Sequence, residues 1–357
     1  MQIAEKEVFM DRINLASDYE EGAHPEIIKK LAETNMLQST GYGTDEFCES
    51  ARNKIRKACE CPEAAVHFLV GGTQANATVI DALLSSYQGV VSAESGHINV
   101  HEAGAIELGG HKVMAVPQHN GKIRASDVRK VCVSYANDPS REHTVMPGMV
   151  YISQPTEFGT LYSLKELTEL STVCREFGIP FYADGARLAY ALASKDNDVT
   201  LQDLARLCDV FYIGGTKCGA LFGEAVVIPD PELIPHFFSI IKQHGALLAK
   251  GRILGIQFDV LFTEDLYLNI GKTAIESAEL LKKTFREKGY KLAFENPTNQ
   301  TFVTVENCVL EEISKYAGTD LWERPDPEHS TVRFATSWAT DINKITELAE
   351  ILPVIRN

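Results

Sequence analysis

The strongest constraint on the fold is an alternation of short apolar runs with helical stretches between residues 60 and 230. Helical stretches at 74–86, 126–135 and 164–177 separate several of the apolar runs. Such alternation is typical of an α/β domain whose mostly parallel sheet is covered by helices. The apolar runs predict a seven-stranded sheet with strands at 66–70, 90–92, 112–116, 149–153, 179–183, 210–213 and 225–228.

The last two predicted strands differ from the others in their connection. They are separated mainly by "GGTKCGALFGE" (214–224), which is too short for a helical crossover. Because parallel neighbours need such a crossover, we expect these two strands to pair antiparallel.

A second, smaller domain of the α+β type is expected towards the C-terminus. The 357 residues exceed the usual size of one core, and the pattern changes after about residue 235. We divide the chain into 1–245, with the N-terminal segment and the large domain, and 246–357. In the second part we expect helices at 251–262, 265–288, 310–316 and from about 341, and strands at 301–305 and 331–335.

Charge and apolar composition argue against several classes of partner. With 34 basic and 49 acidic side chains the formal net charge is −15, whereas nucleic acid or an anionic membrane would favour a basic face. No stretch approaches the roughly 18 apolar residues of a membrane span, and residues 1–10 contain no apolar signal core. We therefore expect a cytoplasmic protein.

The eight cysteines form no recognisable zinc or disulfide pattern. Only Cys59 and Cys61 are close in sequence, and C-x-C alone is not a zinc spacing. For a cytoplasmic chain we interpret all eight as reduced thiols.

A Gly-Gly turn in "FLVGGTQANATVIDALL" (68–84) joins a predicted strand to a predicted helix. Thr73 and the amides that follow Gly71 and Gly72 lie at the helix N-terminus, where free N–H groups and the helix dipole suit a phosphate. The turn is neither a P-loop nor a G-x-G-x-x-G turn. An ordinary βα turn with a Thr cap is the alternative.

Two charged residues follow the ends of predicted strands. Asp184, in "IPFYADGARLAYAL" (179–192), ends a strand, and ligands of α/β sheets collect at carboxyl ends. Arg187 is an alternative, structural partner for this carboxylate. Lys217 follows the next strand among Gly214, Gly215 and Gly219. These glycines leave room for a cofactor, and a lowered pKa would let the amine form a Schiff base; an exposed hairpin lysine is the alternative.

The stretch "SAESGHINVHEAGAIEL" (92–108) contains His97 and His101, with Glu102 adjacent. Two histidines four residues apart share a helix face and suggest a metal, but H-x-x-x-H-E is not a zincin motif and no third ligand is evident. A histidine after a strand is equally suited to cover an aromatic cofactor. We expect no metal.

Taken together, these features describe a site for pyridoxal phosphate. The Gly-Gly turn would bind the phosphate, and Lys217 would bind the aldehyde. Asp184 would keep the pyridine nitrogen protonated, which makes the ring an electron sink. His97 would cover the ring.

The whole pattern resembles the low-specificity L-threonine aldolases, in the β-eliminating-lyase group of fold-type-I pyridoxal-phosphate enzymes. The likeness covers nearly the entire chain and extends into the small domain. It rests on "NLASDYEEGAHP" (14–25), "GYGTD" (41–45), "GGTQAN" (71–76), "GHINVHEAGA" (96–105), "YADGARL" (182–188), "GGTKCGALFGEAV" (214–226), "ALLAKGRILGIQF" (246–258) and "TVRFATSW" (331–338).

The resemblance implies a role for each matching residue. Lys217, Asp184 and His97 would be the catalytic residues at the cofactor ring. The implied binding residues are Gly72, Thr73 and Thr216 for the phosphate, Lys250 or Arg252 as a basic residue from a neighbouring subunit, and Ser17, Arg187 and Arg333 for the substrate carboxylate, with Arg187 also counted in the cofactor site. Tyr42 would reach across the subunit interface of a homodimer or homotetramer.

One segment departs from the family pattern. Many members carry a second active-site histidine in a segment like "ENTHNG", and the matching segment here is "SQPTEFGTLY" (153–162), with Glu157 at the histidine's place. Glu157 would take the proton of the substrate β-hydroxyl if burial raises its pKa. A different β-hydroxy amino acid as substrate, or a structural role for Glu157, is the alternative.

The implied reaction is cleavage of L-threonine, L-allo-threonine or a related β-hydroxy-α-amino acid to glycine and an aldehyde. The alternatives are β-elimination, racemisation or transamination on the same cofactor, and a non-catalytic amino-acid-binding protein.

Overall fold

The computed structural model describes residues 12–355, which form two compact units. The larger unit spans Gly22–Gly271, and the smaller one combines 12–21 with 272–355. The units thus divide later in the chain than the boundary expected after residue 245. The segment 1–10, in which no signal core was recognised, lies outside the described residues.

The core of the larger unit is a seven-stranded sheet in the order β2-β8-β7-β6-β5-β3-β4. Its strands run parallel except β8, which is antiparallel to both of its neighbours. This confirms the predicted sheet and the antiparallel pairing of the last two strands. The strands are β2 (Ala65–Leu69), β3 (Gln88–Ala93), β4 (Lys112–Val116), β5 (Met146–Ser153), β6 (Phe181–Asp184), β7 (Val210–Gly214) and β8 (Glu224–Ile228).

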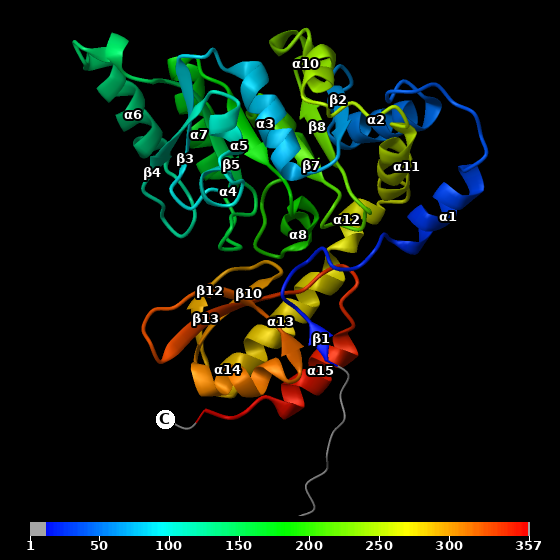
Figure 1. The fold of residues 1–357 in the computed structure, drawn as a ribbon, viewed down its shortest axis with the longest axis vertical. Coiled ribbons are helices and arrows are strands. Elements are labelled where there is room, and N and C mark those ends of the chain that lie inside the picture. The colour runs from blue at the N-terminus through cyan, green and yellow to red at the C-terminus, as the bar shows by residue number, and fades with distance from the viewer. Residues whose placement is uncertain (1–11, 356–357) are drawn as a thin grey trace, which may run out of the picture. The chain divides into compact units, whose positions relative to one another are not determined.

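Helices cover this sheet (Figure 1). Every residue of β6, β7 and β8 is buried, as expected of strands covered on both faces. The helices are α1 (Pro25–Thr34), α2 (Glu46–Ala58), α3 (Gly72–Leu83), α4 (His97–Val100), α5 (Ala105–Leu108), α6 (Ala125–Asn137), α7 (Leu164–Phe177), α8 (Leu188–Ala193), α9 (Leu201–Leu207), α10 (Phe237–Gln243), α11 (Arg252–Leu261) and α12 (Leu266–Ile270).

The bounds of α7 follow directly from its sequence. Ser163 and Glu166 form a capping box at its first turn, and Gly178 ends it in the left-handed conformation with φ 63°. The predicted range 164–177 is therefore confirmed at both ends. In contrast, the single helix predicted at 265–288 is two helices, which meet at Gly271. A side chain at Gly271 would collide with the carbonyl oxygen of Ala189, so close packing against α8 explains this glycine.

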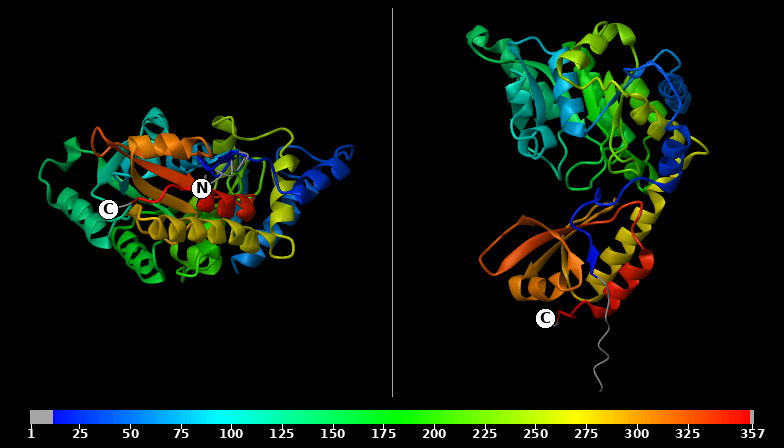
Figure 2. Two further views of the ribbon diagram at one scale, coloured as in Figure 1. Left: turned by 90° about the horizontal axis from the view of Figure 1, so that it is seen from below. Right: turned by 45° about the vertical axis from the view of Figure 1, so that its right-hand side comes forward.

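The smaller unit is of the α+β type, as predicted. Its antiparallel sheet has the order β12-β13-β10-β9, and β1 pairs in parallel with β11. The long helix α13 packs on this sheet and against α15 (Figure 2). The elements are β1 (Ile13–Asn14), α13 (Lys272–Glu287), β9 (Lys291–Phe294), β10 (Gln300–Glu306), α14 (Asn307–Ser314), β11 (Ala317–Gly318), β12 (Asp320–Glu323), β13 (His329–Ala335) and α15 (Ile342–Ile351).

None of the helices within residues 12–355 combines the length and apolar character that crossing a bilayer requires.

Candidate active site

Three neighbouring parallel strands carry Glu157, Asp184 and Lys217 at or just after their carboxyl ends. Asp184 is the last residue of β6 and lies beside Ser153, the last residue of β5. The next strand, β7, ends at Gly214, three residues before Lys217. This edge of a parallel sheet is where ligands of α/β proteins bind.

The carboxylate of Asp184 is buried and fully engaged. Its Oδ2 accepts hydrogen bonds from the Tyr151 hydroxyl at 2.7 Å and from Nδ2 of Asn76 at 3.1 Å. Its Oδ1 accepts hydrogen bonds from the Tyr212 hydroxyl and from the amide of Ala186. Hydroxyl and amide donors therefore hold this carboxylate, and the alternative of a salt bridge to Arg187 is not what anchors it.

Asp184 stays ionised in spite of its burial. Burial raises the pKa of Asp184, but the positive field of His97 and the hydrogen bonds from Tyr212, Tyr151 and Ala186 outweigh it, so that the pKa lies below its ordinary value. A permanent negative charge thus lies at the end of β6. Arg187 follows it half-buried, at the N-cap of α8.

The Gly-Gly turn leads into the N-terminus of α3. Gly71 is the N-cap residue, and no side chain caps the helix, while Thr73 is exposed on its first turn. The Thr cap that would explain an ordinary βα turn is therefore absent. A Cβ at Gly72 would come to 3.0 Å from the Tyr212 hydroxyl, so a glycine at this position keeps the turn close to the ring of Tyr212.

The loop that carries Lys217 is held by a buried glutamate that the sequence analysis missed. Glu224 accepts hydrogen bonds from the Thr216 hydroxyl at 2.8 Å and from the amide of Gly215 at 3.1 Å. The hydroxyl of Tyr190 donates to the carbonyl oxygen of Lys217. Lys217 is half-buried, and an exposed hairpin lysine does not describe it.

Charges at the strand ends act on one another. Burial raises the pKa of Glu224 to about 8, the positive charge of Lys217 lowers it, and the negative charge of Asp184 raises it. The three groups therefore lie within electrostatic range, as residues of one site would.

His97 begins α4 and contacts two carboxylates. Its Nδ1 lies 2.7 Å from Oε1 of Glu102, and its backbone amide donates to Oε1 of Glu157 at 2.9 Å. The rings of His97 and His101 are tilted, with centroids 5.6 Å apart. Nδ1 of His97 thus faces a carboxylate.

Glu157 is buried in the loop after β5. Ser153 donates to its Oε1 at 2.6 Å. Burial raises the pKa of Glu157, and the hydrogen bond from Ser153 and the charge of His97 offset this only in part. The structure therefore brings Glu157 into contact with His97, and burial shifts the pKa of its carboxyl group upward, the direction that favours a general base.

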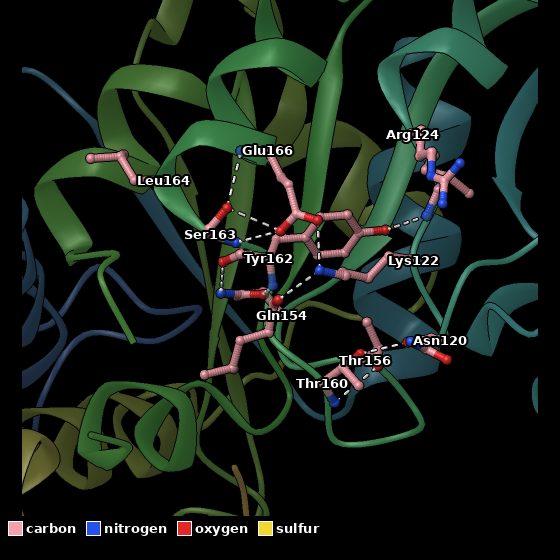
Figure 3. A network of polar contacts seen from close by, with 12 residues as sticks. Asn120, Lys122, Arg124, Gln154, Thr156, Thr160, Tyr162, Ser163, Leu164 and Glu166 are labelled. Carbon is pink, nitrogen blue, oxygen red and sulfur yellow. Dashed lines mark hydrogen bonds and ion pairs between the residues drawn. The ribbon is translucent and has the colours of Figure 1, made fainter. Parts of the chain in front are cut away.

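A network of polar contacts anchors the Glu157 loop on both sides (Figure 3). The side chain of Gln154 bonds both backbone groups of Tyr162, at 3.0 and 2.9 Å. The hydroxyls of Thr156 and Thr160 lie 2.7 Å apart. Such fixed loops position functional side chains with little conformational freedom.

Three other predicted residues, Tyr42, Lys250 and Arg252, make their contacts elsewhere than with these strand-end residues. The guanidinium of Arg252 donates to the carbonyl oxygens of Leu37 and Thr34, at the end of α1. Lys250 is exposed. Tyr42 is 43% exposed, and Nζ of Lys242 lies 4.5 Å from its ring centroid.

The smaller unit contains the other two predicted carboxylate-binding residues. Arg333 on β13 donates to Gln300 at 3.1 Å and forms an ion pair with Asp320 at 2.9 Å. It also donates to the carbonyl oxygen of Ala16, next to Ser17. The hydroxyl of Ser17 is buried and has no hydrogen-bond partner among the described residues.

A cavity near α2, α9 and α12 lies away from these strand-end residues. It has a volume of about 730 Å³ and is lined by residues such as Lys57, Leu201, Leu261 and Tyr267. None of the predicted site residues lines it. Chemistry at the strand ends, and not cavity size, therefore locates the candidate site.

The chain is similar to known proteins over nearly its whole length. A family model described as "Beta-eliminating lyase" matches residues 14–308. The chain is 29% identical over 346 residues to a low specificity L-threonine aldolase of Pseudomonas aeruginosa, with 95% of this chain and 97% of the relative covered. It is 41% identical to the solved structure of Leishmania major threonine aldolase, with a TM-score of 0.92 and coverage of 95% and 98%. An aspartate aminotransferase of Thermus thermophilus has a TM-score of 0.69 at 15% identity, over 95% of this chain and 90% of that one, which is a likeness of fold alone.

Proposed function

Because the chain belongs to the β-eliminating lyase family, we propose that it is a pyridoxal-phosphate-dependent aldolase. Its substrate is L-threonine, L-allo-threonine or a related β-hydroxy-α-amino acid, and its products are glycine and an aldehyde. The substrate follows from the relatives named threonine aldolase, one of them 41% identical over nearly the whole chain. The observation in the molecule that carries the proposal is the ionised, buried Asp184 on the strand beside the Lys217 loop.

The residues present fit pyridoxal phosphate. A buried carboxylate with a lowered pKa suits a protonated ring nitrogen, and the uncapped N-terminus of α3 suits a phosphate. A half-buried lysine suits an aldehyde. The glycines beside it do not open the room expected of them, because a Cβ at Gly214, Gly215 or Gly219 would collide with protein atoms. When bound, the cofactor supplies a sink for the electron pair that is released as the Cα–Cβ bond breaks.

Each residue then has a task of its own. Asp184 would hold the proton on the ring nitrogen, His97 would cover the ring, and Nζ of Lys217 would hold the aldehyde group. Amides at Gly72 and Thr73 and the Thr216 hydroxyl would hold the phosphate. Arg187, Arg333 and Ser17 are the proposed ligands of the substrate carboxylate, since a guanidinium fork grips both carboxylate oxygens.

Glu157 is the proposed base for the substrate β-hydroxyl. Its buried carboxyl group contacts the backbone of His97 and is fixed by Ser153. Accepting the hydroxyl proton in the step that breaks the Cα–Cβ bond needs an ionised base with a pKa near the working pH. Burial shifts the pKa of Glu157 upward, in the direction of this requirement.

A homodimer or homotetramer is part of the proposal, with Tyr42 and Lys250 serving the site of a neighbouring subunit. Of the two basic candidates, the contacts favour Lys250, because Arg252 is engaged with the end of α1 whereas Lys250 is exposed. Lys250→Ala should weaken cofactor binding about tenfold, which corresponds to roughly 1.4 kcal/mol. Arg252→Ala should lower the melting temperature instead.

Product analysis tests the proposed function. Purified, cofactor-loaded protein is given L-threonine, L-allo-threonine and L-phenylserine separately, with Lys217→Ala as the control. Equal amounts of glycine and aldehyde, absent in the control, are expected. Pyruvate with ammonia, the mirror-image amino acid, a keto acid, or binding without turnover would each reject the aldolase and identify the alternative reaction.

A further inference from the structure

Two buried polar residues, Asn76 and Glu102, have no task in the reaction described above. Asn76 is fully buried on α3, and Glu102, 5% exposed, follows α4. They contact each other, because Nδ2 of Asn76 lies 2.7 Å from Oε1 of Glu102. Burying an amide and a carboxylate is costly unless both are well partnered.

The contacts determine which way the amide of Asn76 points. Its Nδ2 lies within hydrogen-bond distance of two carboxylates, Glu102 at 2.7 Å and Asp184 at 3.1 Å. Ionised carboxylates only accept hydrogen bonds, so the NH₂ group must face them. Its Oδ1 then accepts from the Tyr182 hydroxyl at 2.9 Å. Burial raises the pKa of Tyr182 well above its ordinary value, so this phenol remains a donor.

The same reasoning determines where His97 carries its proton. Oε1 of Glu102 lies 2.7 Å from Nδ1 of His97, and a carboxylate requires a donor there. In neutral His97 the proton is therefore on Nδ1, and Nε2 carries the free lone pair. The side chain of Glu102 is inaccessible, while that of His97 is 31% exposed. The carboxylate thus acts from within the protein on a ring that reaches the site.

We propose that Glu102 and Asn76 are positioning residues: Glu102 holds His97 in the Nδ1–H form, and Asn76 connects Glu102 to Asp184. The chain of contacts runs from Tyr182 through Asn76 to both carboxylates and from Glu102 to His97. The contacts thus couple the orientation of His97, proposed to cover the ring, to that of Asp184, proposed to face the ring nitrogen. The inference rests on the proposed function only in assigning these two groups to a cofactor.

Glu102→Gln is the direct test, because it keeps the shape and removes the charge. A glutamine side chain both donates and accepts, so it no longer imposes Nδ1–H on His97. The tautomer is measured by nitrogen-15 NMR on histidine-labelled apoprotein at a pH where His97 is neutral, with His97→Asn for assignment. The wild type should show Nδ1–H, and Glu102→Gln a mixture of both tautomers.

The same variant is assayed for glycine release and for cofactor affinity. We expect kcat to fall about 10- to 100-fold, on the scale seen when a partner that orients a functional histidine is removed, with KM and the cofactor Kd changed less than about threefold. Asn76→Ala is the second variant, and its folding is checked by circular dichroism. It should leave His97 in the Nδ1–H form but weaken cofactor binding through Asp184.

Asp81→Asn serves as a matched control. Asp81 also lies on α3 and contacts two histidines, with Nε2 of His244 at 2.8 Å and Nε2 of His111 at 3.3 Å. This variant should move the signals of those two histidines and leave His97, kcat and cofactor affinity unchanged.

Two results would overturn the proposal: an unchanged His97 tautomer in Glu102→Gln, or a changed tautomer with wild-type kcat. If the wild type makes no glycine at all, the proposed function fails. The tautomer comparison still decides the contact between Glu102 and His97, because it is made on apoprotein.

Discussion

Asp184 and Glu157 are both buried carboxyl groups at the ends of neighbouring strands, yet their pKa values move in opposite directions. Burial is the largest influence on each and raises both. Asp184 nevertheless titrates below its ordinary value, because two tyrosine hydroxyls, one backbone amide and the charge of His97 outweigh burial. Glu157, with the Ser153 hydroxyl as its side-chain donor, titrates above its ordinary value.

The comparison shows how one edge of a sheet provides two different acids. Depth of burial does not separate Asp184 from Glu157, but the donors around them do. A permanently ionised group suits the ring nitrogen of a cofactor, and a group with a raised pKa suits proton transfer. The variants below each change one of the buried carboxyl groups at these strand ends.

The largest effect is expected from Asp184→Asn, which removes the permanent charge. The neutral amide cannot balance a protonated ring nitrogen, so kcat/KM for glycine release should fall by about 10³-fold, with weaker cofactor binding in apoprotein titrations. The control is Asp209→Asn, at the opposite end of β6, where Asp209 accepts a hydrogen bond from the amide of Phe181. Wild-type turnover in Asp184→Asn would contradict the assignment.

Glu157→Gln should lower kcat about 100-fold, since a lost general base costs this much. Because the pKa of Glu157 is raised, the wild-type rate should increase with pH as this group ionises. This increase forms the acidic limb of the pH–rate profile, and it should disappear in Glu157→Gln. Ser153→Ala sharpens the comparison, because losing this hydrogen bond raises the pKa of Glu157 further and shifts the limb to higher pH. A limb that persists in Glu157→Gln would assign it to another group.

The smallest effect concerns Glu224 and stability. Burial raises its pKa from 4.5 to about 8, so between these values the folded chain holds a proton that the unfolded chain releases. Its contribution to stability is therefore present below pH 4.5 and is lost as the pH rises towards 8. The urea midpoint of unfolding should decrease from pH 5 to pH 8, and this decrease should be larger in the wild type than in Glu224→Gln. A constant difference between the two proteins would show that Glu224 does not titrate in this range.

Much of the fold follows from local sequence pattern. The strands of the large sheet are continuous apolar runs, and α7 begins with a capping box and ends at Gly178. The glycine at 271, between α12 and α13, has no explanation in the local sequence, because it is the close packing against Ala189, far away in the sequence, that requires it. The short strands β1 and β11 pair over about 300 residues, and neither carries a pattern of its own.

The candidate site divides in the same way. Lys217, Asp184 and His97 can be recognised in the sequence, because each is a polar or charged residue at or just after the end of an apolar strand. Glu224, Asn76 and Glu102 have no such signal, since their roles depend on contacts with distant residues. Asn76, for example, meets Asp184 across 108 positions. The tyrosines around Asp184 look in sequence like ordinary core residues.

The sequence by itself determined which strands form the large sheet and closely where each of them ends, and therefore which charged groups lie at the edge of that sheet. These properties depend on the spacing of apolar residues and on helix capping, and both can be read from one short segment of the chain. The tertiary structure alone decided the protonation of these groups and the hydrogen bonds of Asn76, Glu102 and Glu224. A pKa depends on donors and charges within a few ångströms, and folding brings those together from strands and helices far apart in the chain.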